Sequence, residues 1–169
     1  MINDFVDEFA RYKGLGSKAI EQVSEENLHR VLGEENNSIA VIMRHLGGNL
    51  ASRFTGFLTS DGEKPWRNRD SEFEYGRQTR EELMTVWSNG WNVLERELSS
   101  LSDADLSREV AIRGHAMSVH AALARSLAHI SYHVGQIVFL ARVFAEGDWQ
   151  WLSIPKGKSA EYNRNPTKG

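Results

Sequence analysis

The sequence predicts an all-α fold, a four-helix bundle with a long loop between its second and third helices and a small hairpin before the last. Four long segments carry apolar residues at every third or fourth position, the spacing of helices that bury one face. Only one short stretch alternates apolar and polar residues, as strands do. A chain of 169 residues is large enough to form a core without disulfides, so we expect a single domain over residues 1–169.

The composition narrows the classes of function. A net charge of −3 with 25% charged residues gives no electrostatic reason to expect nucleic acid or an anionic membrane as a partner. The acidic N-terminus lacks the basic region of a signal peptide, and no apolar run approaches the roughly 20 residues of a membrane span. We therefore expect a cytoplasmic protein. The absence of cysteine excludes disulfides, cysteine-bound zinc and a catalytic thiolate, which leaves His, Asp and Glu as metal ligands.

The first half of the chain predicts two long helices joined by a connector. Helical spacing extends over residues 3–23, and a serine followed by two acids then predicts a short helical segment over residues 24–33. The second long helix begins at residue 37 or 38 and runs to residue 58 or 59. Gly47 and Gly48 are unfavourable inside a helix, so they indicate either the close approach of a neighbouring helix or room for a ligand.

The second half predicts a loop, two more helices and a hairpin. Residues 60–77 are polar but contain aromatic side chains, which favours an ordered loop. A capping box predicts the start of the third helix, over residues 79–101. Partial alternation over residues 108–119 predicts the hairpin. The last helix, from residue 118 or 119 to 145, is apolar around most of its circumference and is expected to be the most buried, whereas the tail from about residue 156 is expected to be mobile.

Three histidines form the candidate metal site. His129 and His133 are one helical turn apart in the last predicted helix, so their imidazoles lie on one side of it. His45 lies on the apolar second helix. Three imidazoles from two buried helices would make a tripod with an open fourth position, the pattern of catalytic rather than structural zinc. The alternative is that each histidine is an ordinary hydrogen-bonded residue of the core or of an interface.

These histidines and their neighbours resemble the DinB-like superfamily. The resemblance is carried by His45 in the second helix and by His129 and His133 followed by Gly135-Gln136 in the last helix. More narrowly, the chain resembles a DUF1572-type branch of uncharacterised bacterial proteins. That second resemblance is carried by Gly48-Asn49, Ser52-Arg53-Phe54, the loop from Asp61 to Asp70 and the late Trp151-Leu152-Ser153-Ile154-Pro155.

The resemblance implies a metal-binding four-helix bundle with a crossover, usually a homodimer. It implies a divalent metal, zinc or nickel, held by His45, His129 and His133. Members with an assigned activity are thiol-dependent transferases or isomerases that use a low-molecular-weight bacterial thiol. A metal with an open position lowers the pKa of a bound water or thiol, which would supply the nucleophile that this cysteine-free chain lacks.

Two residues follow His45 on its face of the second helix. Asn49 and Arg53 lie four and eight residues after His45, so both are candidates for contact with a substrate. Arg53 is suited to bind a carboxylate of a substrate or of a thiol cofactor. The alternative for Arg53 is a salt bridge to a loop acid such as Asp70 or Glu72.

Further candidates come from other segments. Trp66, Arg67 and Arg69, on the long loop, are candidates to cover the pocket, although packing within the loop is the alternative. Gln136 lies three residues after His133 and is a candidate to orient that ligand. No residue stands out as a general base.

The leading functional hypothesis is a metal-dependent thiol S-transferase or a related enzyme that acts on a small molecule. The first alternative is a dimeric bundle that binds metal or a small molecule without turnover. The second is a structural dimer with three ordinary core histidines, which predicts no bound metal. The sequence leaves the substrate, the thiol and the identity of the metal open.

Overall fold

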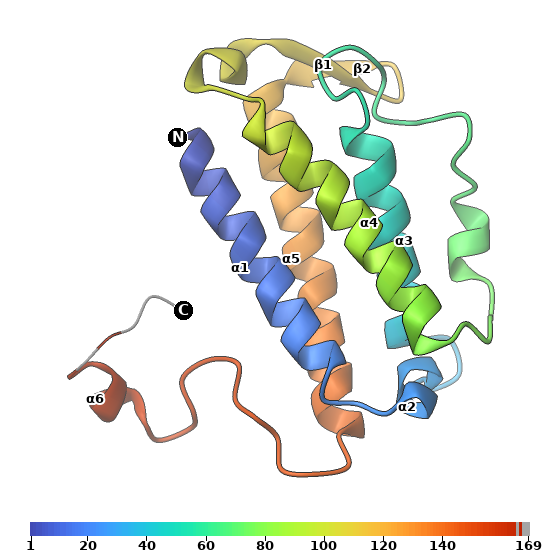
Figure 1. Ribbon diagram of the computed structural model, residues 1–169, viewed down its shortest axis with the longest axis vertical. Coiled ribbons are helices and arrows are strands. Elements are labelled where there is room, and N and C mark those ends of the chain that lie inside the picture. The colour runs from blue at the N-terminus through green and yellow to red at the C-terminus, as the bar shows by residue number, and fades with distance from the viewer. Residues whose placement is uncertain (165, 167–169) are drawn as a thin grey trace.

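The computed structural model describes residues 1–164 and 166, and it is mostly helical (Figure 1). Its helices are α1 (Ile2–Ile20), α2 (Glu25–His29), α3 (Ile39–Phe54), α4 (Arg80–Ser99), α5 (Val119–Phe144) and α6 (Ser159–Tyr162), with short 3-10 turns η1 (Asp70–Phe73) and η2 (Asp103–Ser107). Strands β1 (Glu109–Ile112) and β2 (His115–Ser118) form one antiparallel pair. The predicted all-α class is therefore confirmed.

The four long helices, α1, α3, α4 and α5, lie side by side around a common apolar core (Figure 1). α3 packs most extensively on α4, and α1 packs on α5, while the contacts of α3 with α5 and of α1 with α4 are less extensive. The looser contact between α3 and α5 leaves room for polar side chains between these two helices. The expectation that α5 would be the most buried helix was wrong, because 12 of the 16 residues of α3 are buried but only 10 of the 26 residues of α5. The apolar side chains of Tyr132, Phe139 and Val143 on α5 are exposed.

The close contact between α3 and α4 depends on two glycines. A Cβ on Gly47 would lie 2.5 Å from the backbone oxygen of Val86, and a Cβ on Gly90 would lie 2.6 Å from the backbone oxygen of Gly47. Real side chains do not tolerate such distances, so the two backbones meet directly. For Gly47 the structure selects the first of the two expectations, the close approach of a neighbouring helix.

Three predicted boundaries were wrong. α1 ends at Ile20 rather than residue 23, and α2 ends at His29 rather than near residue 33. α3 ends at Phe54, four or five residues before the predicted end. Phe57 is buried in the core at helical spacing, but Gly56 has a φ of +58°. Apolar spacing alone therefore overestimated the helix, because the chain turns at Gly56 and still buries the next aromatic side chain.

The predicted hairpin is present, and it is tied to the long loop. Its turn places Arg113 at φ 55° and Gly114 at φ 73°, the conformation of a type I′ turn. The Asp61 carboxylate accepts hydrogen bonds from the backbone N–H groups of both turn residues, at 2.8 and 2.7 Å. The Gly62 N–H donates to the Ala111 carbonyl at 2.8 Å. The start of the loop is thus joined to the hairpin at one end of the helices, and the rest of the loop runs along their side (Figure 1).

The chain after α5 first packs on the bundle through Trp149 and Leu152 and then leads to α6 (Figure 1). The predicted mobile tail, from about residue 156, covers only the last part of this segment, and residues 165 and 167–169 of it lie outside the described residues. Within the described ranges, no helix is both long enough and apolar enough to cross a lipid bilayer.

Candidate metal centre

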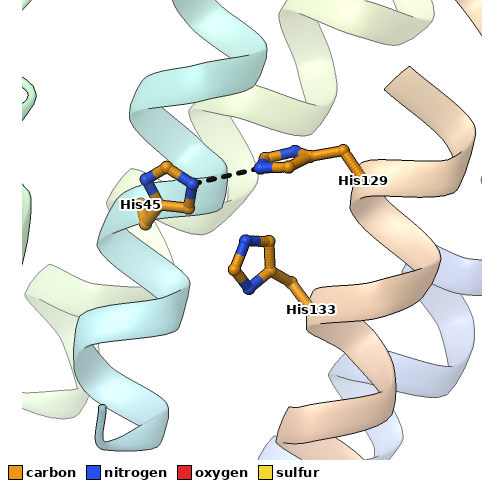
Figure 2. A group of neighbouring side chains, drawn as sticks. All are labelled: His45, His129 and His133. Atoms are coloured by element: carbon orange, nitrogen blue, oxygen red, sulfur yellow. Dashed lines mark hydrogen bonds between the residues drawn. The ribbon is translucent and has the colours of Figure 1, made fainter. Parts of the chain in front are cut away.

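The three predicted histidines come together between α3 and α5. His45 projects from α3, and His129 and His133 project from successive turns of α5, so that the imidazoles face one another (Figure 2). One nitrogen from each ring lies within 4.8 Å of the others. The ring centroids are 5.2 Å apart for His45 and His129, 4.9 Å for His45 and His133, and 4.6 Å for His129 and His133. Such a cluster is compact enough to hold one metal ion.

Both helices that carry the histidines begin at a serine N-cap. The Ser38 hydroxyl accepts from the backbone N–H of Val41, and the Ser118 hydroxyl accepts from that of Ala121. A serine in this position satisfies one of the free N–H groups of the first turn. The apolar residues of α3 and α5 then direct their core faces inward, and His45, His129 and His133 lie at the edge of those faces.

A buried carboxylate sets the orientation of His45. Its Nδ1 lies 2.9 Å from Oε2 of Glu72, and its Nε2 lies 3.2 Å from Nε2 of His129. Because an ionised carboxylate only accepts hydrogen bonds, Nδ1 of His45 donates to Glu72. The Nε2 lone pair then points at His129, toward the space between the three rings. A carboxylate behind a histidine is the usual arrangement around metal-ligating histidines.

Glu72 is held ionised by a buried arginine. Nε and Nη2 of Arg67 each donate to one carboxylate oxygen of Glu72 at 2.8 Å. The Arg67 side chain is only 2% exposed. Burial alone would raise the pKa of Glu72, but the hydrogen bonds from His45 and Arg67 outweigh burial and leave that pKa lowered. Glu72 is therefore a charged acceptor at neutral pH.

Glu72 also explains Gly48. A Cβ on Gly48 would lie 2.3 Å from Oε1 of Glu72. The room that Gly48 provides is therefore filled by the loop carboxylate. Sequence reasoning placed Glu72 only as a partner for Arg53 and missed its role behind His45. The signal that would have found it is a glycine on α3 beside a candidate ligand, together with an acid on the loop that follows.

His133 has its own orienting partner. Its Nδ1 lies 2.8 Å from Oε1 of Gln136, one turn further along α5. Since an amide oxygen accepts, Nδ1 of His133 donates and Nε2 keeps its lone pair. The structure thus brings Gln136 to the ligand that it was proposed to orient.

The two histidines of α5 are neutral at physiological pH. Burial, followed by the proximity of His133 and His45, lowers the pKa of His129 to about 3. Burial lowers the pKa of His133 as well, against the opposing hydrogen bond to Gln136. Metals bind the neutral imidazole, so these ligands need no deprotonation at neutral pH.

A cavity of about 310 Å³ opens beside the histidines. Its lining residues are His45, Asn49, Arg53, Arg67, Arg69, Phe73, Ile112, Arg113, Arg125, Ser126, His129 and His133. The predicted substrate residues Asn49 and Arg53 thus share the cavity with the histidines. Trp66 is 59% exposed and is not part of the lining, so the structure does not bring it to the site.

Arg53 has a different partner from the acids considered in the sequence. Nη1 of Arg53 donates to the Gly62 carbonyl at 2.6 Å and lies 3.3 Å from Oε2 of Glu63. The Ser52 hydroxyl donates to the same carbonyl at 2.8 Å. Arg53 therefore holds the loop in place. Among the described residues it forms no salt bridge with Asp70 or Glu72, the acids named as its alternative partners.

The comparisons with known proteins give a family but no activity. Residues 1–158 match the model of a family described as Protein of unknown function (DUF1572). The search of curated proteins finds no match.

Proposed function

The chain belongs to the DUF1572 family, and from that premise we propose that it is a DinB-like four-helix bundle which binds a divalent metal through His45, His129 and His133. We further propose that it uses the metal as a thiol S-transferase or a related enzyme with a low-molecular-weight bacterial thiol. Zinc and nickel are among the metals that imidazole ligands suit. A cytoplasmic homodimer belongs to the same proposal.

One observation carries the metal proposal: Nε2 of His45 and Nε2 of His129 face each other at 3.2 Å while Glu72 fixes Nδ1 of His45. Without a metal, one of these two nitrogens must donate a hydrogen bond to the other, whereas a cation between them would bind the lone pairs of both. Gln136 fixes the third ring in the same way through Nδ1 of His133. Partners on Nδ1 thus orient the rings of His45 and His133, and Nε2 of His129 faces Nε2 of His45.

Each part of the site has a role in the proposed reaction. A divalent metal in the open tripod would lower the pKa of a bound water or thiol and so provide a nucleophile near pH 7. Phe73, whose ring centroid lies 4.9 Å from that of His45, shields one side of the cluster from water. Asn49 and Arg53 offer a hydrogen-bonding amide and a positive charge to the substrate from the same face of α3.

The metal proposal is tested by metal analysis of protein purified without a histidine tag. We expect close to one equivalent of zinc or nickel in the parent and almost none in His129→Ala. The matched control is His120→Ala, because His120 is an exposed histidine of the same helix whose ring meets that of Phe5 edge-on, outside the cluster. A folded parent that contains no metal and takes up none on reloading would rule out the metal site.

One observation favours the second candidate, a bundle that binds metal or a small molecule without turnover. Among the described residues that line the cavity, none is a carboxylate that could serve as a general base. A screen of electrophiles with bacillithiol, mycothiol, glutathione and coenzyme A separates the two candidates. Saturable, metal-dependent conjugation supports the transferase, whereas a metal-loaded protein that is inert with every thiol supports the binding protein.

A further inference from the structure

The cavity beside the histidines is unusually rich in arginine. Five guanidinium groups line it: Arg53 from α3, Arg67 and Arg69 from the long loop, Arg113 from the hairpin turn and Arg125 from α5. No acidic side chain belongs to the lining among the described residues. Like charges that share a cavity repel, so this arrangement is costly unless acids outside the lining or a bound anion compensate it.

Acids behind the wall compensate part of this charge. Glu63 accepts from Nε of Arg113 at 2.9 Å and lies 3.3 Å from Nη1 of Arg53, so one carboxylate serves two guanidinium groups. Glu72 is occupied by Arg67 and also by His45. These two carboxylates face three arginines, which leaves a surplus of positive charge before the remaining two arginines are considered.

The remaining two arginines have weak partners or none. Arg69 lies 3.8 Å from Asp70, a carboxylate whose side chain is 96% exposed, and its guanidinium stacks on Phe73 at 4.8 Å. An ion pair that exposed contributes little. Over residues 1–164 and 166, no hydrogen bond or ion pair holds the guanidinium of Arg125. Arg125 lies one turn from His129 on α5, so an unpaired cation stands beside the candidate metal centre.

We propose that this cavity binds a small molecule through an oxyanion, a carboxylate or a phosphate, which Arg125 engages together with Arg113 and Arg69. A guanidinium presents paired N–H donors that match the oxygens of either group. A cavity of about 310 Å³ suits a small metabolite rather than a macromolecule. Within the proposed function, which this inference extends, the anionic end of the substrate or thiol lies on the arginines and its reacting end lies toward the histidines.

The test measures binding by isothermal titration calorimetry on the full chain, both as purified and after treatment with a chelator. The probes are succinate for carboxylates, pyrophosphate for phosphates and succinamide as the neutral counterpart of succinate. We expect saturable binding of at least one anion and none of succinamide. Whichever anion binds more tightly identifies the chemical class of the ligand.

Two variants make the test specific. Arg125→Gln removes the guanidinium that has no partner, so the fold should be unaffected while affinity for the anion falls about tenfold or more. Arg96→Gln is the matched control, because it removes one positive charge from the exposed surface of α4, where the Arg96 side chain is 67% exposed. Affinity in this control should equal that of the parent.

The outcomes separate this inference from the metal proposal. Anion binding that depends on Arg125 and persists after chelation supports the arginine site, whether or not the protein binds metal. Metal uptake with no saturable binding of succinate or pyrophosphate overturns the inference and leaves the metal proposal standing. An equal loss of affinity in Arg125→Gln and Arg96→Gln also overturns it, because binding would then follow overall charge.

Discussion

The Glu72 carboxylate fills the space that a side chain at Gly48 would need: a Cβ on Gly48 would lie 2.3 Å from Oε1 of Glu72. The glycine is on α3, three residues after His45, and the carboxylate reaches it from η1. The loop acid can therefore stand behind the histidine only because α3 has no side chain at position 48. The hydrogen bond that orients His45 therefore depends on the absence of a side chain at position 48 of the same helix.

Gly48→Ala should weaken metal binding without touching a ligand. The new methyl group displaces Glu72 from Nδ1 of His45, and loss of such an orienting partner typically lowers metal affinity about 10- to 100-fold. Competition with a chromogenic zinc chelator measures the change. Gly14→Ala is the control, since its Cβ would meet nothing within 4 Å on α1. Parental affinity in Gly48→Ala would mean that Glu72 does not support the site.

Glu72→Ala should destabilise the protein strongly. It leaves the guanidinium of Arg67, 2% exposed, without its carboxylate, and removing one partner of a buried ion pair costs about 3–5 kcal/mol. Urea unfolding of the metal-free protein measures this change separately from metal binding. As a control, Arg108→Ala breaks the exposed pair with Asp105 and should cost less than about 1 kcal/mol. Similar losses in both variants would contradict the buried pair.

Gly90→Ala should separate α3 from α4. Its Cβ would lie 2.6 Å from the backbone oxygen of Gly47, and backbone cannot move aside as a side chain can. Overpacking of this kind costs about 1–3 kcal/mol, which opposes the gain in helix propensity of less than about 1 kcal/mol. Thermal unfolding should therefore show a lower midpoint for Gly90→Ala and a slightly higher one for Gly14→Ala. A stabilised Gly90→Ala variant would contradict the direct backbone contact.

Asp61 should make stability depend on acid pH. Hydrogen bonds from the backbone N–H groups of Glu63 and Gly114, and then of Arg113, lower the pKa of Asp61 to about 2. A lowered pKa contributes stability that is complete above the ordinary value of 3.8 and is lost as the pH falls toward 2. Urea unfolding from about pH 6 to about pH 2 measures the free energy of unfolding of the parent and of Asp61→Asn. The parent should be the more stable of the two near neutral pH, and this difference should shrink below about pH 4. A difference in the free energy of unfolding that stays constant over this range would mean that ionisation of Asp61 does not stabilise the protein.

The sequence predicted the long helices well because their signals are local. Helical spacing, the capping box at Thr79 and the serine caps depend on neighbouring residues, and α4 and the hairpin lie close to their predicted limits. The end of α3 was wrong because Phe57 is apolar and correctly spaced, whereas the turn at Gly56 depends on the loop that follows.

The three histidines were predictable because two of them share one helix and the third lies on an apolar helix of its own. Arg53, Arg67 and Arg69 were named from the sequence as candidates near the pocket, but the other two arginines of its lining were not. Arg113 and Arg125 reach the cavity from the hairpin turn and from α5, and no spacing in the chain relates them to Arg53. Glu72 was missed for the same reason, since its role appears only when the loop folds back over Gly48.

The hydrogen bonds that Asp61 makes to the turn of the hairpin have a consequence for engineering this protein. The loop contributes Arg67 and Arg69 to the cavity, and the hairpin contributes Arg113. The two segments therefore shape the cavity together. A replacement loop without an acid at the position of Asp61 would leave the turn without its carboxylate acceptor. A change of ligand preference that replaces the loop must therefore keep this acid or replace the hairpin as well, although about fifty residues separate the two segments in the chain.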